Sequence, residues 1–118
     1  MNLNTSKAKR KTKDQERSPA KTITAEFRGL DYYRLPGSLS RDDNYQTLRI
    51  KGKQLPPGYE VTYFDYDKTT SISVRGKSFG FEKTAMIPKE ILQAPGEKRA
   101  VITDKNKKFI GIMFFNVE

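Results

Sequence analysis

The feature that most constrains the fold is a strict alternation of apolar and basic residues at positions 47–53 (TLRIKGK). In an extended chain, Leu48 and Ile50 point to one side, whereas Arg49, Lys51 and Lys53 point to the other. This period of two is typical of a β-strand that has one face on a hydrophobic core and one face in solvent. The sequence therefore predicts a sheet that carries a row of cations.

Similar patterns, bounded by turn residues, predict strands along most of the remaining chain. These strands and hairpin arms cover residues 22–27, 59–63, 71–75, 99–103 and 108–115. Residues 109–115 (FIGIMFF) are the most apolar run, and we expect them to form a central strand. Phe79 and Phe81 also have a two-residue spacing, which favours a place in the core. The alternative is base stacking on single strands, because Lys77 and Lys83 flank these aromatic rings.

Few segments favour a helix. The best candidate is residues 88–93, where Pro88 occupies the first helical position and its missing N–H costs nothing. Pro95 and Gly96 end it after one or two turns. We expect residues 29–37 to form an aromatic loop and residues 38–44 to be polar and exposed.

The pattern predicts a mainly β protein, most economically a small β-barrel with at most one or two short helical turns. Residues 23–118 are long enough for one small domain with a modest core. Residues 1–22 carry seven basic and two acidic side chains, and no Val, Ile, Leu or aromatic residue lies between Leu3 and Ile23. Such a segment cannot bury enough apolar surface to offset the entropy of ordering, so we predict a disordered basic arm.

An internal repeat is one interpretation of the strand pattern. Residues 47–74 can be aligned with residues 84–112 so that Pro57-Gly58 meets Pro95-Gly96, with an offset that drifts between 37 and 38 positions. A true duplication would give two strand–hairpin halves that complete each other's core. Chance similarity is the alternative, and an OB-like or SH3-like barrel then fits the strand pattern equally well.

Two of these segments resemble a known family. Residues 86–92 (MIPKEIL), followed by Pro95-Gly96 and a predicted hairpin, resemble the "IPKE" segment of AbrB-type swapped-hairpin DNA-binding domains. Residues 48–55 (LRIKGKQL) resemble the "LKGKWL" segment of their SymE-like relatives. The resemblance covers about half of the chain. It implies a nucleic-acid-binding barrel with basic residues near these segments on the binding face.

The charge distribution favours an anionic partner. The formal charge is +9, of which the arm carries +5 and residues 23–118 carry +4. Dense cations neutralise phosphates and release counterions, so nucleic acid is the partner that we favour. The candidate phosphate contacts are Lys9, Arg10, Lys11 and Lys13 in the arm, and Arg49, Lys51, Lys53, Arg75 and Lys77 on the predicted sheet. A solubilising terminus and an ordinary solvated sheet face are the alternatives.

Three tyrosines in polar surroundings are further candidates: Tyr32, Tyr33 and Tyr45. Aromatic rings beside cations suit base stacking on single strands. The same rings could instead anchor a protein interface, because each has an apolar body and a polar tip. These tyrosines therefore do not distinguish a nucleic-acid partner from a protein partner.

The composition also excludes several kinds of chemistry. The chain has no Cys and no His, which rules out thiolate chemistry, Cys/His zinc sites and a histidine base. The acidic residues of 42–43 and 65–67 lie in predicted turns, where Asp is a good turn former. We therefore predict no enzyme activity, no metal site and no cofactor. No apolar run is long enough to span a membrane, and the lack of Cys favours a cytoplasmic protein.

The sequence thus predicts a small accessory or regulatory protein that binds DNA or RNA with a β-sheet face and a flexible cationic arm. The alternative is an adaptor or inhibitor that docks a basic, tyrosine-bearing surface on an acidic protein. The oligomeric state stays open.

Overall fold

The computed structural model describes residues 19–67 and 69–118. Lys9, Arg10, Lys11 and Lys13 therefore lie outside the described residues. The elements are β1 (Lys21–Glu26), β2 (Tyr32–Leu39), β3 (Tyr45–Lys51), β4 (Glu60–Asp65), β5 (Ser71–Arg75), β6 (Lys77–Phe79), β7 (Glu82–Met86), η1 (Lys89–Leu92), β8 (Gly96–Thr103) and β9 (Phe109–Val117). The predicted mainly β fold is confirmed. Strand β1 begins at Lys21, inside the segment that the sequence assigns to the arm.

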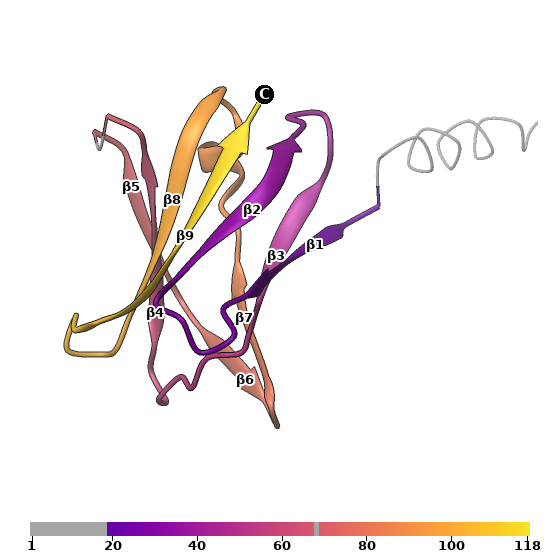
Figure 1. Ribbon diagram of the computed structural model, residues 1–118. Coiled ribbons are helices and arrows are strands. Elements are labelled where there is room, and N and C mark those ends of the chain that lie inside the picture. Colours follow the sequence, from indigo (N-terminus) through magenta and orange to yellow (C-terminus); the bar gives the residue numbers. More distant parts are fainter. Residues whose placement is uncertain (1–18, 68) are drawn as a thin grey trace, which may run out of the picture.

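The strands form two mixed sheets that face each other (Figure 1). The four-stranded sheet has the order β1-β3-β7-β6, and the five-stranded sheet has the order β2-β9-β8-β4-β5. The pairs β1–β3 and β2–β9 are parallel, and the other pairs are antiparallel. The sheets do not close into a barrel, which corrects the prediction. Consecutive strands β1 and β2 pair with β3 and β9 instead of with each other, so no ladder joins the sheets there.

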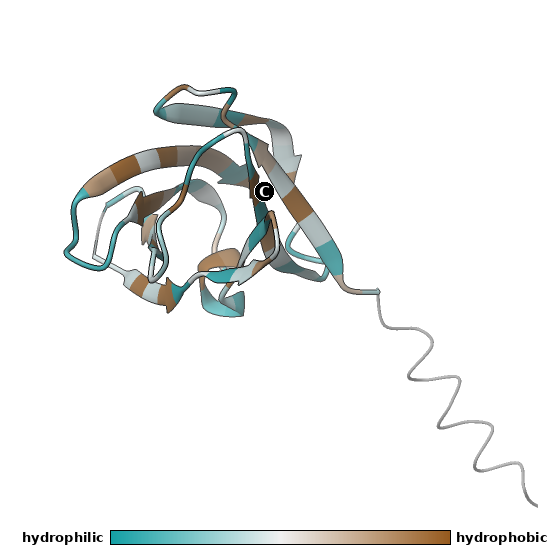
Figure 2. Cartoon of the chain, turned by 90° about the horizontal axis from the view of Figure 1, so that it is seen from below, coloured by the Kyte–Doolittle hydropathy of each residue, from teal (hydrophilic) through white to brown (hydrophobic). Residues whose placement is uncertain are grey.

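The core lies between the two sheets and follows the predicted alternation of apolar and polar residues. This alternation is visible in Figure 2 as hydrophobic and more hydrophilic bands along the strands. From the four-stranded sheet, Leu48, Ile50 and Ala85 are buried. From the five-stranded sheet, the inner face includes Tyr63 and Phe115. Strand β9 is an interior strand with a partner on each side, as its apolar sequence predicts.

Equivalent elements of the two suggested halves occur in the same order, and two of the three equivalent strand pairs are neighbours in a sheet. Strands β3, β4 and β5 correspond to β7, β8 and β9, and η1 occupies the second connection. Strand β3 pairs antiparallel with β7 and β4 pairs antiparallel with β8, as a two-fold arrangement requires. However, β1 runs parallel to β3, whereas β6 runs antiparallel to β7. The likeness of the halves is therefore confined to the central strands.

Two local predictions are wrong. Much of the expected loop at residues 29–37 belongs to β2, which pairs with β9, a strand far away in the sequence. Phe79 and Phe81 are not in the core. Their relative solvent exposures are 70% and 103%, so Phe81 is as exposed as in an extended peptide. They belong to the β6–β7 hairpin, which projects at the bottom of Figure 1 beyond the layer that covers the core. The predicted short helical segment is confirmed as η1, with Ile91 and Leu92 buried.

Candidate nucleic-acid interface

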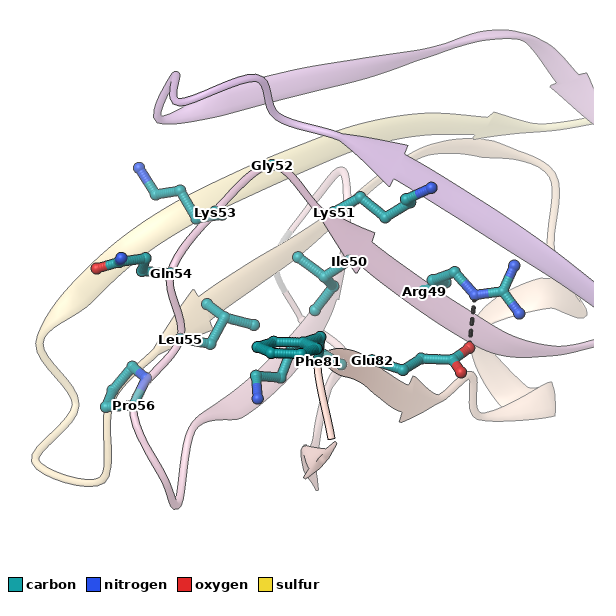
Figure 3. A pocket seen from close by; sticks show the side chains of 11 residues that line it. Arg49, Ile50, Lys51, Gly52, Lys53, Gln54, Leu55, Pro56, Phe81 and Glu82 are labelled. Carbon is teal, nitrogen blue, oxygen red and sulfur yellow. Dashed lines mark hydrogen bonds and ion pairs between the residues drawn. The ribbon is translucent and has the colours of Figure 1, made fainter. Parts of the chain in front are cut away.

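An open groove of about 970 Å³ lies where β3 ends and the β6–β7 hairpin turns. Its two walls come from segments 49–56 and 81–83, which the β3–β7 pairing brings together. Four cations line it: Arg49, Lys51, Lys53 and Lys83. We call this site the β3–β7 groove (Figure 3).

Phe81 stands at the tip of the hairpin because of the turn that holds it. Phe79 pairs with Glu82, so Gly80 and Phe81 are the only residues of the turn. Gly80 has a φ of +62°, and glycine suits this first central position in the tight turns that join twisted strands. The side chain at the next position then has no neighbouring strand to pack on. The full exposure of Phe81 is therefore a consequence of a two-residue turn.

The cations at the end of β3 are paired with carboxylates. Arg49 Nε lies 2.7 Å from Glu82 Oε2, and Lys51 Nζ lies 3.9 Å from Glu26 Oε1. All four side chains are at least two-fifths exposed. Exposed pairs of this kind contribute little to stability, typically about 0–1 kcal/mol, because water screens them. An incoming anion can therefore replace either carboxylate at little cost.

Lys53 departs from the predicted cationic row. Strand β3 ends at Lys51, and Gly52 with a φ of +73° turns the chain. Lys53 Nζ then lies 2.6 Å from Asp31 Oδ1 and 3.1 Å from the Leu30 carbonyl oxygen, and its side chain is only 14% exposed. Lys53 thus lines the groove with its stem while its ammonium group holds the Leu30–Asp31 loop.

The structure separates the two remaining predicted cations. Lys77 of β6 lies opposite Thr84 of β7, which lies opposite Arg49 of β3. Lys77 and Arg49 are therefore on one face, about 10 Å apart at the usual strand spacing. Arg75 pairs with Glu60 in the five-stranded sheet instead, so it does not belong to this surface.

A buried tyrosine fixes the hairpin that carries Phe81. Tyr59 Oη lies 2.7 Å from the carbonyl oxygen of Lys77 and 2.8 Å from that of Thr84, and these two residues face each other across β6 and β7. Burial, the largest influence, raises the pKa of Tyr59. Nearby, Tyr63 donates a hydrogen bond to the Met86 carbonyl oxygen, and burial also raises its pKa. Both phenols therefore stay neutral and can donate these bonds.

Only one of the three candidate tyrosines is freely exposed. The relative solvent exposure of Tyr32 is 58%. Tyr33 packs against the core, with its ring centroid 6.2 Å from that of Phe27. Tyr45 is also partly buried, and Lys21 Nζ lies 5.6 Å from its ring centroid. Tyr45 and Lys77 line a second groove, of about 540 Å³, further along β3 and β7.

A mixed cationic and aromatic row that the sequence did not predict lies on the outer face of the five-stranded sheet. Arg34, Phe114, Arg99 and Phe64 lie opposite one another on β2, β9, β8 and β4. Arg34 pairs with Glu97 and lies 5.2 Å from the centre of the Phe114 ring. Arg99 has no side-chain partner within the part of the chain that the structure describes, and its Nε is buried. Strand register produces this row, and no local pattern could have revealed it.

Other kinds of site are not seen in residues 19–67 and 69–118. No group of three or more His, Cys, Asp or Glu side chains is arranged to hold a metal ion in this part of the chain. None of the helical segments described there is long and apolar enough to cross a membrane.

Comparisons with models of protein families, with characterised proteins and with solved structures found no match to this chain. The two segments that resemble AbrB- and SymE-type domains nevertheless have defined places. Residues 48–55 contribute most of one wall of the β3–β7 groove, and residues 86–90 line the second groove.

Proposed function

We propose that this protein binds the sugar–phosphate backbone of nucleic acid in the β3–β7 groove, in an accessory or regulatory role rather than as an enzyme. The observation that carries the proposal is one open groove lined by the charged groups of Arg49, Lys51 and Lys83, with the stem of Lys53 beside them. Among the described residues, its lining includes one carboxylate, that of Glu82. Lys77 extends the positive surface across the sheet. The absence of Cys favours a reducing compartment, and we propose the cytoplasm.

The spacing of the groove cations suits a chain of phosphates. Arg49 and Lys51 lie two residues apart on one strand, which separates their Cα atoms by about 6.5–7 Å. Successive phosphates of an extended nucleic-acid strand have a similar spacing, so neighbouring phosphates could each meet one cation. Contacts of this kind set position on the backbone and carry no sequence information. The basic arm would add further phosphate contacts and further salt dependence.

A salt series tests the proposal. Binding of labelled DNA and RNA oligonucleotides should weaken steeply with salt, because each neutralised phosphate contributes about 0.7–0.9 to the slope of log affinity against log salt. The double variant Arg49→Ala/Lys51→Ala should bind more weakly and reduce this slope by about 1.4–1.8. Lys105→Ala/Lys108→Ala removes the same charge from the exposed β8–β9 turn and is the matched control.

Two results would overturn the proposal. One is no binding to any oligonucleotide at low salt. The other is an equal loss of affinity in the groove variant and in the control, which would mean that only net charge matters. Deletion of residues 1–18 then measures the contribution of the arm separately.

A second candidate function is docking on an acidic protein through the outer face of the five-stranded sheet. Arg99 supports it, because this residue lies between two aromatic positions of the sheet and has no carboxylate partner among residues 19–67 and 69–118. Tyr32, Ile112 and Val101 form the adjacent row of the same face. Such a mixture of aromatic, aliphatic and Arg side chains is typical of protein interfaces.

A pulldown that uses the wild type and two double variants as bait tests this second function. A protein that binds the wild type and Arg49→Ala/Lys51→Ala, but not Tyr32→Ala/Arg99→Ala, would support it once the purified pair binds directly. Loss of binding on neutralising an acidic residue of that partner would place the carboxylate opposite Arg99. Equal binding to both variants would exclude this face.

A further inference from the structure

We propose that the β3–β7 groove takes single-stranded rather than duplex nucleic acid, and that a base stacks on Phe81. This inference rests on the proposed function and names its substrate class. It depends on the placement of the Phe81 ring on one wall of the groove and of Arg49 and Lys51 on the other.

The aromatic wall presents an unused stacking surface. Phe81 is fully exposed, so both faces of its ring are free of protein contacts. Beside it, Leu55 and Pro56 form an apolar part of the opposite wall, and Phe79 is 70% exposed on the preceding strand. An exposed Phe held at the tip of a tight turn loses little conformational freedom when it stacks. Stacking of one base on such a ring is worth about 1–3 kcal/mol.

The cationic wall lies opposite. Arg49 and Lys51 project from β3, whereas Phe81 projects from the β6–β7 turn, and Ile50 lies between Lys51 and Phe81 (Figure 3). A strand that enters the groove could therefore lay its phosphates along β3 while its bases point toward Phe81. Only an unpaired strand offers phosphates and base faces on separate sides in this way.

A duplex does not match this arrangement. Its bases are paired and stacked inside the helix, and its outer surface presents phosphates and sugars to any shallow groove. To reach a base face, Phe81 would have to insert between base pairs and unstack them, which costs a few kcal/mol per step. Phe81 would then contribute nothing to duplex binding, which would depend on the cations alone.

The experiment compares the full chain with Phe81→Ala on labelled oligothymidylate, oligouridylate and a duplex of equal length. We expect Phe81→Ala to weaken single-strand binding by about 5- to 150-fold, the equivalent of one stacked base, and to leave duplex binding unchanged. Phe109→Ala is the matched control, because Phe109 is a half-exposed phenylalanine at the start of β9 in the other sheet. Phe81 contacts no core residue, so its replacement should not affect folding.

A second readout detects stacking directly. The chain has no Trp, so Phe81→Trp introduces one fluorophore at the hairpin tip. Its emission should be quenched on addition of oligothymidylate and not on addition of the duplex, whereas Phe109→Trp should respond to neither.

The possible failures are distinguishable. Equal affinity for single strands and duplex, with no effect of Phe81→Ala, would overturn this inference and leave backbone binding in the groove intact. No binding of any oligonucleotide at low salt would overturn both. Binding that Phe81→Ala and Phe109→Ala weaken equally would also reject a specific stacking role.

Discussion

The ring of Tyr59 leaves no room for a side chain at position 76: a Cβ atom on Gly76 would lie 2.0 Å from Cε2 of that ring. The Gly76 N–H also donates a 2.8 Å hydrogen bond to the Tyr59 carbonyl oxygen. Because Gly76 joins β5 to β6, this contact determines where the chain leaves the five-stranded sheet and begins the hairpin of the groove. Tyr59 thus connects the core to the candidate site.

Gly76→Ala should therefore destabilise the protein. Overpacking against a buried side chain typically costs about 1–3 kcal/mol, and Tyr59 cannot move away without losing its bonds to β6 and β7. Chemical denaturation measures the loss of free energy of unfolding. Gly111→Ala is the control, because a Cβ there would lie 3.3 Å from Phe27 and needs only a small adjustment. Equal stability of the two variants would contradict the prediction.

Tyr63 should remain neutral until the protein unfolds. Burial raises its pKa above the usual value of about 10, so the stability that its neutral form contributes is present below that pH and is lost as the pH rises further. In an alkaline titration of tyrosinate absorbance, Tyr63 should ionise late, together with unfolding. Tyr63→Phe should remove one late tyrosine and cost about 0.5–1.5 kcal/mol through the lost bond to Met86.

Tyr66→Phe is the control for this titration, since Tyr66 is 70% exposed. It should leave the amplitude of the late phase unchanged. A late phase of the same amplitude in Tyr63→Phe would contradict the assignment.

Replacing Asp65 should destabilise the protein more than replacing its ion-pair partner Lys98. The two residues lie opposite each other on β8 and β4, and Lys98 is only 2% exposed. Asp65→Asn leaves a buried ammonium group without its carboxylate and should cost up to about 3–5 kcal/mol. Lys98→Met removes the charge together with its desolvation penalty and should cost much less.

The double variant Lys98→Met/Asp65→Asn separates the two effects. Its stability, measured by denaturation, should be close to that of Lys98→Met, because no unpaired buried cation is left. If Lys98→Met were the more damaging single change, the ion pair itself would be the main source of stability.

Removal of a competing carboxylate should strengthen nucleic-acid binding. Glu82→Gln frees Arg49 in the groove, and we expect oligonucleotide affinity to rise about 2- to 5-fold, in line with an exposed pair worth under about 1 kcal/mol. Glu97→Gln frees Arg34 on the other sheet and is a matched control with the same change in net charge. An equal gain in both variants would mean that the groove has no special role.

Local pattern was enough to predict most of the strands, because a period of two depends only on neighbouring residues. Strand β2, which lies where the sequence predicted a loop, is an exception. Leu48 and Ile50 are buried as expected, and Pro88 precedes a single 3₁₀ turn. The same rule misplaced Phe79 and Phe81, since alternation distinguishes two faces of a strand but not whether anything covers them. The β6–β7 hairpin extends past the core, so both rings are exposed.

The sequence by itself thus determined a mainly β chain, its principal turns, and Arg49 and Lys51 on the solvent side of one strand. Only the tertiary structure decided which carboxylates meet these cations, that Arg75 lies in the other sheet, and that Phe81 faces the end of β3 across a groove. These outcomes depend on pairings between strands far apart in the chain, notably β3 with β7. Such pairings are selected by the packing of the whole core, which no short segment of the sequence encodes.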